Sequence, residues 1–209
     1  YSSIDREGRY AFGRQLNIIF WNLARLGETL IPLIGKDMQQ TAETLTQILE
    51  EKNKQGASLY QQMLCKKIGF EKPGTNESEL VNDLLHIMKN NKLDYTNTFI
   101  QLKNAISLNS IENLNNQKLE NWYLEWKKYI DKNNLNIHSI IDLMSKNNPM
   151  IIPRNHNVER ALVNAAKGDI SFFYSLLEAF KKPYDENPEF AELMQPPEDE
   201  TGYQTFCGT

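Results

Sequence analysis

Apolar residues recur three or four positions apart along most of the chain, which is the period of an α-helix that lies on a core. The longest such segment carries the apolar residues Leu16, Ile18, Ile19, Phe20, Trp21, Leu23, Leu26, Leu30 and Ile31. Together they surround most of the helix circumference, and this is typical of a helix in the middle of a core. The sequence therefore predicts a buried central helix over residues 16–31, which Pro32 should kink or end.

Capping and stop residues bound the other predicted helices. Residues 41–68 form one or two helices, with Gly56 as the candidate break. Asn76, followed three positions later by Glu79, resembles a capping box, and Asp94 is suited to cap the next helix. The expected helix ends are marked by Asn90-Asn91, Asn133-Asn134, Asn147-Asn148 and Gly168.

The end of the chain differs from the rest. Asp169 should cap the last strong helix, and Pro183 should end it. From Tyr184 onward the sequence is acidic and rich in proline, which predicts a tail that is either ordered by docking or loose. No segment shows the sustained alternation of a strand. We expect an all-α fold with a helical lobe over residues 1–183 and a tail over residues 184–209.

Composition and charge narrow the functional classes. The chain has 209 residues, a net charge of -4 and no long run of Lys or Arg, so no nucleic-acid partner is expected. Polar residues and a proline interrupt the apolar stretch over residues 16–34, so no membrane span is expected. The chain begins with Tyr1 rather than methionine, which indicates a piece of a longer protein.

The two cysteines, Cys65 and Cys207, are too few for a disulfide framework, which favours a reducing compartment. Cys207 lies third from the end of the chain, in a tail that is poorly suited to bury a thiol. Because cysteine is usually buried, an exposed terminal one suggests redox or disulfide chemistry, with an accidental surface thiol as the alternative. Cys65 follows Met63 and Leu64 on a predicted helix, so we expect it to be buried.

Other candidates have competing structural explanations. The sequence Arg154-Asn155-His156 could bind an anion at a helix start, but capping and docking of that helix is favoured. Arg25 needs a partner inside a buried helix, and Glu28 is placed to pair with it. An aromatic stripe could form a ligand platform, although its helical spacing favours core packing; it contains Trp122, Tyr123 and Trp126.

No complete active site is visible in the sequence. It lacks a glycine-rich phosphate loop, the GxSxG and HExxH motifs, and the HRD and DFG motifs of kinases. No Cys/His cluster has the spacing of a zinc site. From these residues we assign no catalytic, cofactor-binding or metal-binding residue, and only Cys207 is a candidate redox residue.

Five motifs nevertheless follow one another in a recognisable order. They are Gly8-Arg9-Tyr10 with Trp21-Asn22-Leu23-Ala24-Arg25-Leu26; Lys67-Ile68-Gly69-Phe70; Asp94-Tyr95-Thr96; Asn148-Pro149 with Arg154-Asn155 and Lys167-Gly168-Asp169; and Cys207-Gly208-Thr209. This order resembles the selenoprotein O family, also called YdiU, which consists of protein adenylyltransferases with a kinase-like fold. Three departures leave the role of those positions open: Leu16 replaces the usual proline, Ile100 the usual arginine, and Gly208-Thr209 the usual two serines.

The resemblance implies that this chain is the carboxyl-terminal, helical part of a longer enzyme. That enzyme would transfer AMP from ATP to Ser, Thr or Tyr hydroxyls of protein substrates, with magnesium bridging the phosphates. The groups that bind ATP and magnesium would lie upstream of Tyr1, so none is carried onto this chain. The segment from Leu16 to Ile31 would correspond to the hydrophobic central helix of the large kinase-like lobe.

The resemblance also gives Cys207 a possible partner, because a disulfide with an upstream cysteine would link activity to redox state. Cys65 is a weaker partner, since we expect it to be buried. Two alternatives remain: a non-catalytic helical interaction module, and a kinase-like protein that transfers a phosphoryl group or UMP. The family implies the cytoplasm for a bacterial protein and the mitochondrion for a eukaryotic one.

Overall fold

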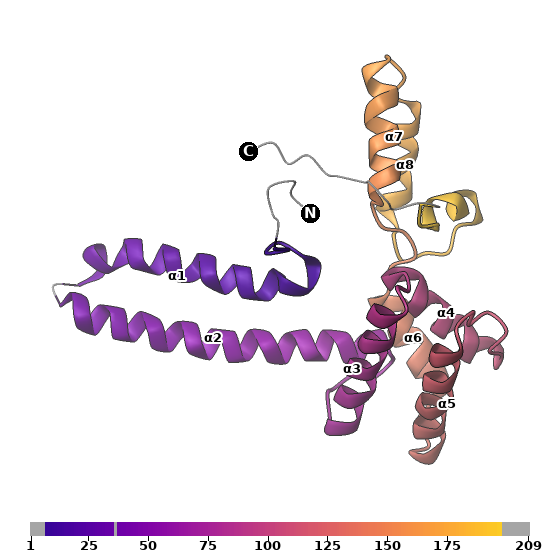
Figure 1. Cartoon of the computed structure of the whole chain (residues 1–209), viewed down its shortest axis with the longest axis horizontal. Helices are drawn as coiled ribbons and strands as arrows, with labels where there is room; N and C mark the ends of the chain where they lie inside the picture. The colour runs from indigo at the N-terminus through magenta and orange to yellow at the C-terminus, as the bar shows by residue number, and fades with distance from the viewer. Residues whose placement is uncertain (1–6, 36, 198–209) are drawn as a thin grey trace. The chain divides into compact units, whose positions relative to one another are not determined.

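The computed structural model describes residues 7–35 and 37–197 (Figure 1). Within these ranges the chain forms eight α-helices and two short 3-10 helices, with no β-strand. The predicted all-α class is therefore confirmed. No helix in the described part is both long and apolar enough to cross a membrane.

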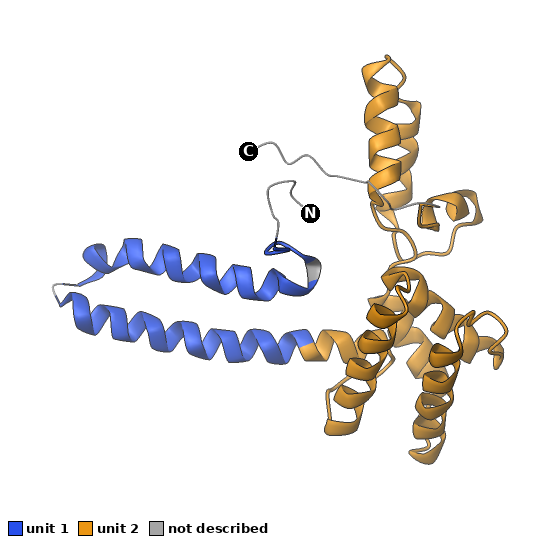
Figure 2. Ribbon diagram, in the orientation of Figure 1, with its two compact units in different colours: residues 1–60, 199–209 blue, residues 61–198 orange. Residues whose placement is uncertain are grey.

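The chain divides into two compact units, of which the first comprises the described residues up to Tyr60 (Figure 2). It contains the 3-10 helix η1 (Phe12–Arg14), helix α1 (Gln15–Ile34) and most of helix α2 (Met38–Lys67). Helices α1 and α2 lie side by side, with Leu45 beside the backbone of Gly27 (Figure 1). Unit 1 is therefore a helical hairpin.

Gly56 has a packing role instead of breaking the helix. Helix α2 runs unbroken from Met38 to Lys67, so the proposed break at Gly56 is wrong. A Cβ atom at this position would lie 3.1 Å from side-chain atoms of both Leu16 and Phe20. The missing side chain thus lets α1 approach α2 closely, which offsets the low helix propensity of glycine.

The prediction of a buried central helix is wrong for this chain on its own. Helix α1 forms and ends two residues after Pro32, as the pattern indicated, but its only buried residue is Ile18. Trp21 and Leu26 are about half exposed, at 48% and 54%. The reason is that a hairpin partner covers only one side of a helix, so α1 carries more apolar surface than α2 can bury.

Unit 2 begins at Gln61 with the end of α2 and holds the main core. Its further elements are α3 (Thr75–Asn90), α4 (Tyr95–Leu108), α5 (Gln117–Lys132), α6 (Ile137–Asn147), α7 (Asn155–Ala166), α8 (Ser171–Lys181) and the 3-10 helix η2 (Pro188–Met194). Helix α3 packs on α5, α4 on α6, and α7 on α8. The largest fully buried side chains of the core are Trp126 and Phe99.

The aromatic stripe of α5 belongs to this core, as its helical spacing predicted. Trp122 and Trp126 stack with ring centroids 5.6 Å apart, and Tyr123 meets Trp126 edge-on at 5.8 Å. The polar atoms are also satisfied in part, because Trp122 donates to the carbonyl of Leu80 and Tyr123 to that of Ala105. Core packing is therefore confirmed over a ligand platform.

A second apolar cluster lies at the α7–α8 end of unit 2. It consists of Ile100, Met150, Ile151, Ala161, Leu176, Ala179 and Leu193. Leu193 comes from η2, in the acidic, proline-rich segment, and Phe190 and Met194 of the same segment pack against the cluster. The part of the predicted tail over residues 188–194 is therefore ordered by docking.

Most of the predicted helix ends are confirmed, and two predicted starts are wrong. Ile170, not Asp169, is the N-cap of α8, although the Asp169 carboxylate accepts a hydrogen bond from the backbone N–H of Ser171. Helices α3 and α6 end at Asn90 and Asn147, and Asn133 is the C-cap of α5. Helix α3 begins at Thr75 without a side-chain cap, so Asn76 lies in its first turn and does not cap it. Glu77 has a tertiary role, since its carboxylate accepts a hydrogen bond of 2.5 Å from Tyr129.

Gly69 and Gly168 both have a backbone conformation that favours glycine, but they differ in how closely their surroundings are packed. Both have positive φ, +86° and +90°. At such φ values a residue with a Cβ atom destabilises the folded state by about 1–2 kcal/mol, because the Cβ approaches the backbone too closely. A Cβ at Gly69 would also overlap the side chain of Ile140 and lie 3.2 Å from its Cα, whereas one at Gly168 meets nothing within 4 Å. We expect Gly69→Ala to lower the free energy of unfolding clearly more than Gly168→Ala, as measured by urea denaturation. Equal losses would show that the contact with Ile140 adds nothing.

Candidate functional site

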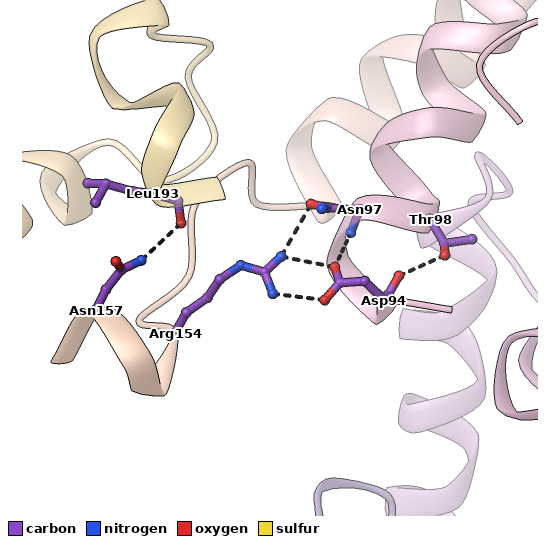
Figure 3. Close-up of polar contacts among 6 residues, drawn as sticks. All are labelled: Asp94, Asn97, Thr98, Arg154, Asn157 and Leu193. Atoms are coloured by element: carbon purple, nitrogen blue, oxygen red, sulfur yellow. Dashed lines mark hydrogen bonds and ion pairs between the residues drawn. The ribbon is translucent and has the colours of Figure 1, made fainter. Parts of the chain in front are cut away.

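The family-like motifs of unit 2 supply two sets of buried or half-buried polar contacts, which we call the motif cluster: Lys67 with Asn148, and Arg154 with Asp94 and Asn97. Asp94 caps helix α4 as predicted, because its Oδ1 accepts a hydrogen bond of 2.8 Å from the backbone N–H of Asn97. The same carboxylate accepts hydrogen bonds from both terminal nitrogens of Arg154, at 2.8 and 2.9 Å (Figure 3). One side chain therefore starts α4 and also holds the residue that precedes α7.

This ion pair is largely shielded from water. The side chain of Arg154 is 8% exposed and that of Asp94 24%. Burial by itself would raise the pKa of Asp94, but the hydrogen bonds from Arg154 and from the backbone of Asn97 outweigh it and hold the pKa below its ordinary value of 3.8. A bidentate pair with low exposure is costly to break, because removing one partner leaves the other charge shielded from water and unpaired.

Arg154 makes further contacts that fix its neighbourhood. Its guanidinium also donates to the side-chain oxygen of Asn97, at 3.3 Å. Three residues later, the buried Asn157 donates from its side-chain amide to the carbonyl of Leu193 in η2 (Figure 3). The start of α7 is thus joined to α4 on one side and to the 3-10 helix η2 on the other.

Lys67 and Asn148 form the second half of the cluster through reciprocal contacts. The ammonium of Lys67 donates to the carbonyl of Asn147 at 3.0 Å and to Oδ1 of Asn148 at 3.3 Å. In return, the side-chain amide of Asn148 donates to the carbonyl of Lys67 at 2.8 Å and to that of Met144 at 2.9 Å. These bonds cap the ends of α2 and α6 and hold them together.

Lys67 is an unusual lysine because it is only 9% exposed. Its ammonium lies 5.1 Å from the ring centroid of Phe99 and 5.5 Å from that of Tyr95, both on α4. Burial lowers the pKa of Lys67 to about 8, so the group still carries its proton at neutral pH. Its charge is held by carbonyl oxygens and aromatic faces.

The charged groups of the cluster are engaged by neighbouring groups of the protein. The terminal nitrogens of Arg154 are engaged by Asp94 and Asn97, and Lys67 is enclosed by its acceptors and rings. The docking role predicted for Arg154-Asn155-His156 is therefore confirmed for Arg154, although its side chain forms no cap hydrogen bond with its own helix. Burial, together with the charges of Arg154 and Arg160, lowers the pKa of His156 below its usual 6.5.

The other candidates lie apart from this cluster. Arg25 pairs with Glu28 at 2.7 Å as predicted, but both side chains are about half exposed. Cys65 is fully buried on α2, as expected, and burial raises the pKa of its thiol. Cys207 lies outside the described residues. No three His, Cys, Asp or Glu side chains in the described ranges come together as a metal site.

Sequence reasoning singled out four of the five residues of the cluster, missing Asn97, and it found few of the cluster's contacts. Asp94 was identified as a cap, and Lys67 and Asn148 were identified only as parts of motifs. The pairings of Lys67 with Asn148 and of Asp94 with Arg154 join residues about 80 and 60 positions apart. A charged residue expected to be buried, with no partner nearby in sequence, was the available sign of such a contact.

Known proteins with similar sequences cover the whole chain. A family model described as "Protein adenylyltransferase SelO" matches residues 2–181. A "Protein nucleotidyltransferase YdiU" from Pelagibacter ubique is 40% identical over 210 residues, covering 100% of this chain and 43% of that protein. Proteins of the same name from Maridesulfovibrio salexigens and Clostridium perfringens are 40% and 36% identical, with 44% and 43% of their lengths covered. The chain thus spans less than half the length of these relatives.

The buried ion pair predicts a pH-dependent contribution to stability. Asp94→Asn keeps a capping side chain but removes the charge, so we expect a loss of about 3 kcal/mol at pH 7. The folded-state pKa of Asp94 is depressed, so its contribution is present above pH 3.8 and is lost as the pH falls through the folded pKa. The difference in unfolding free energy between wild type and variant should therefore shrink below pH 3.8.

Asp142→Asn is the matched control, because Asp142 pairs with Lys146 at 2.6 Å while both side chains are more than 60% exposed. We expect it to cost less than about 1 kcal/mol. Chemical denaturation between pH 2.5 and 7 measures both variants. A loss for Asp94→Asn that is as small as the control's, or independent of pH, would contradict the assigned role of the pair.

Proposed function

Because this chain belongs to the SelO family of protein adenylyltransferases, we propose that it is the helical, carboxyl-terminal part of an enzyme that transfers AMP from ATP to Ser, Thr or Tyr hydroxyls of other proteins. The observation that carries the proposal is the family match over residues 2–181. The order of the sequence motifs supports it, and so does the all-α architecture expected of such a part.

In this proposal ATP and magnesium are held by a part of the enzyme that this chain does not contain. When bound, magnesium would neutralise charge that builds up on the leaving pyrophosphate. We derive no step through either group from the residues of this chain. For the same reason, we expect the chain by itself to be inactive.

The role proposed for this chain is that of scaffold in the large lobe of a kinase-like fold. The motif cluster supports such a role, because Asp94 and Arg154 fix α4 against α7 while Lys67 and Asn148 fix α2 against α6. Fixed elements of this kind place a catalytic constellation that lies elsewhere in the polypeptide. A protein of a bacterial source would act in the cytoplasm, and one of a eukaryotic source in the mitochondrion.

A redox link through Cys207 is a further part of the proposal. The thiol would form a disulfide with a cysteine in the part of the enzyme outside this chain, with loss of two electrons and two protons to a thiol oxidant. Cys65 is the less suitable partner because it is fully buried. Reduction by a dithiol would restore both thiols.

The function is tested on the family-length polypeptide, by which we mean the longest reading frame that contains this chain. We expect label from ATP carrying ³²P at the α-phosphate to appear on substrate proteins, and chelation of magnesium to abolish it. Label from the γ-phosphate would identify phosphoryl transfer instead, and label from α-labelled UTP would identify UMP transfer. No transfer of any label would favour the non-catalytic interaction module.

The redox link is tested by comparing two cysteine variants of the same polypeptide. A thiol oxidant should change the rate of AMP transfer by the wild type, and Cys207→Ser should remove that response while leaving the fold intact. Cys65→Ser is the control and should respond as the wild type does. An unchanged oxidant response in Cys207→Ser would rule out this cysteine as the redox element.

A further inference from the structure

The ends of helices α2 and α6 meet at a joint that has a lysine inside it. The ammonium of Lys67 donates to the carbonyl of Asn147 and to Oδ1 of Asn148, and the amide of Asn148 donates back to the carbonyl of Lys67. We call these three residues the lysine joint. Lys67 is 9% exposed and Asn148 4%. Opening the joint brings a buried amine into water, so its strength depends on whether that amine is charged.

The groups that face the ammonium carry no formal charge at neutral pH. Helix α4 contributes the rings of Tyr95 and Phe99, with centroids 5.5 and 5.1 Å away, and the end of α6 contributes a backbone carbonyl and a side-chain amide oxygen. Of these groups, Tyr95 has the titratable side chain. Asp94, the N-cap of α4, is bound to Arg154, which balances its charge. Burial is therefore what changes the proton affinity of Lys67.

We propose that the lysine joint is a pH-sensitive latch, which closes more firmly as the pH rises from about 7 to 9. The closed joint disfavours the charged ammonium because it lies out of water, whereas the open joint hydrates it. Loss of the proton keeps the contacts, since a neutral amine retains two N–H donors for the acceptors of Asn147 and Asn148. Opening therefore takes up a proton, and closing releases one. The latch goes beyond the proposed function and does not depend on nucleotide transfer.

Burial lowers the pKa of Lys67 to about 8 in the closed joint, from an ordinary value of 10.5. Between these two values the open joint binds more protons than the closed one, so the free energy of opening rises with pH. Well below pH 8 the amine is charged in both states, and its contribution no longer changes with pH. From these two values, the equilibrium constant for opening should fall about tenfold between pH 7 and pH 9.

Cys65 reports on this opening because it is fully buried on α2, two positions before Lys67. A buried thiol reacts with iodoacetamide when its surroundings open, and its rate follows the population of the open state. The family-length polypeptide is labelled at pH 7 and pH 9, and mass spectrometry follows the peptide that carries Cys65. Lys67→Met is the latch variant, because methionine is also unbranched and does not titrate. Dividing the wild-type rate by the variant rate at each pH cancels the titration of the thiol itself.

We expect the ratio of wild type to Lys67→Met to be about tenfold smaller at pH 9 than at pH 7, because the variant has no proton to exchange at this position. Lys66→Met is the matched control. Lys66 is adjacent to Cys65 and carries the same charge, but its side chain is 27% exposed and pairs with Glu71 at 3.1 Å. The ratio of wild type to Lys66→Met should therefore be the same at both pH values. The range ends at pH 9, below the value of about 10 at which tyrosine side chains ordinarily titrate.

Two outcomes of the labelling would overturn the latch. A ratio of wild type to Lys67→Met that is equal at pH 7 and pH 9 would show that opening takes up no proton at this lysine. An equal fall for Lys67→Met and Lys66→Met would show that any positive charge near the thiol has the same effect, whether or not it is buried.

A measurement on the wild type alone keeps the proposal testable if Lys67→Met does not fold. In the family-length polypeptide labelled with ¹³C-lysine, NMR should show a lysine Cε signal with a titration midpoint at about pH 8. This is well below the ordinary lysine value of about 10.4. The absence of such a signal would overturn the proposal whatever the labelling rates are.

Discussion

The contact between Asp94 and Arg154 is the one on which the arrangement of unit 2 depends. Each oxygen of the carboxylate accepts a hydrogen bond from the guanidinium, and one of them also caps helix α4. The contact joins the helices of the main core to the α7–α8 end, whose apolar cluster contains Ile100 of α4 itself. A buried charge without a partner destabilises the folded state, so replacing either residue leaves the other as a destabilising, unpaired charge.

Lys67 and Asn148 solve a related problem by different means. Two helix ends that meet in a buried place leave carbonyl groups unsatisfied. Lys67 supplies a donor to the end of α6, and Asn148 supplies one to the end of α2. Residues of three family-like motifs therefore have a structural role in this chain. Their contacts join α2 to α6 and α4 to α7.

Unit 1 leaves one apolar face of its first helix uncovered. The length and apolar pattern of α1 suit a helix covered on several sides, yet α2 covers one side and leaves Leu23, Leu26 and Leu30 exposed. Gly56 and Gly27 show that the contact with α2 is close and specific. The surplus apolar surface lies on the other face of α1.

The sequence by itself determined the local structure of this protein. Helical periodicity gave the all-α class, and Asp94 and the asparagine pairs marked helix ends, because caps and stops act over a few residues. The capping box at Asn76 failed because α3 begins one residue before it, at Thr75, with Gly74 in the cap position. Family membership was also visible in the order of the motifs. Only the tertiary structure decided that Arg154 meets Asp94, that Lys67 meets Asn148, and that α1 stays exposed. These contacts and exposures depend on which segments, far apart in the sequence, pack together in the fold. A pattern over a few neighbouring residues does not determine that.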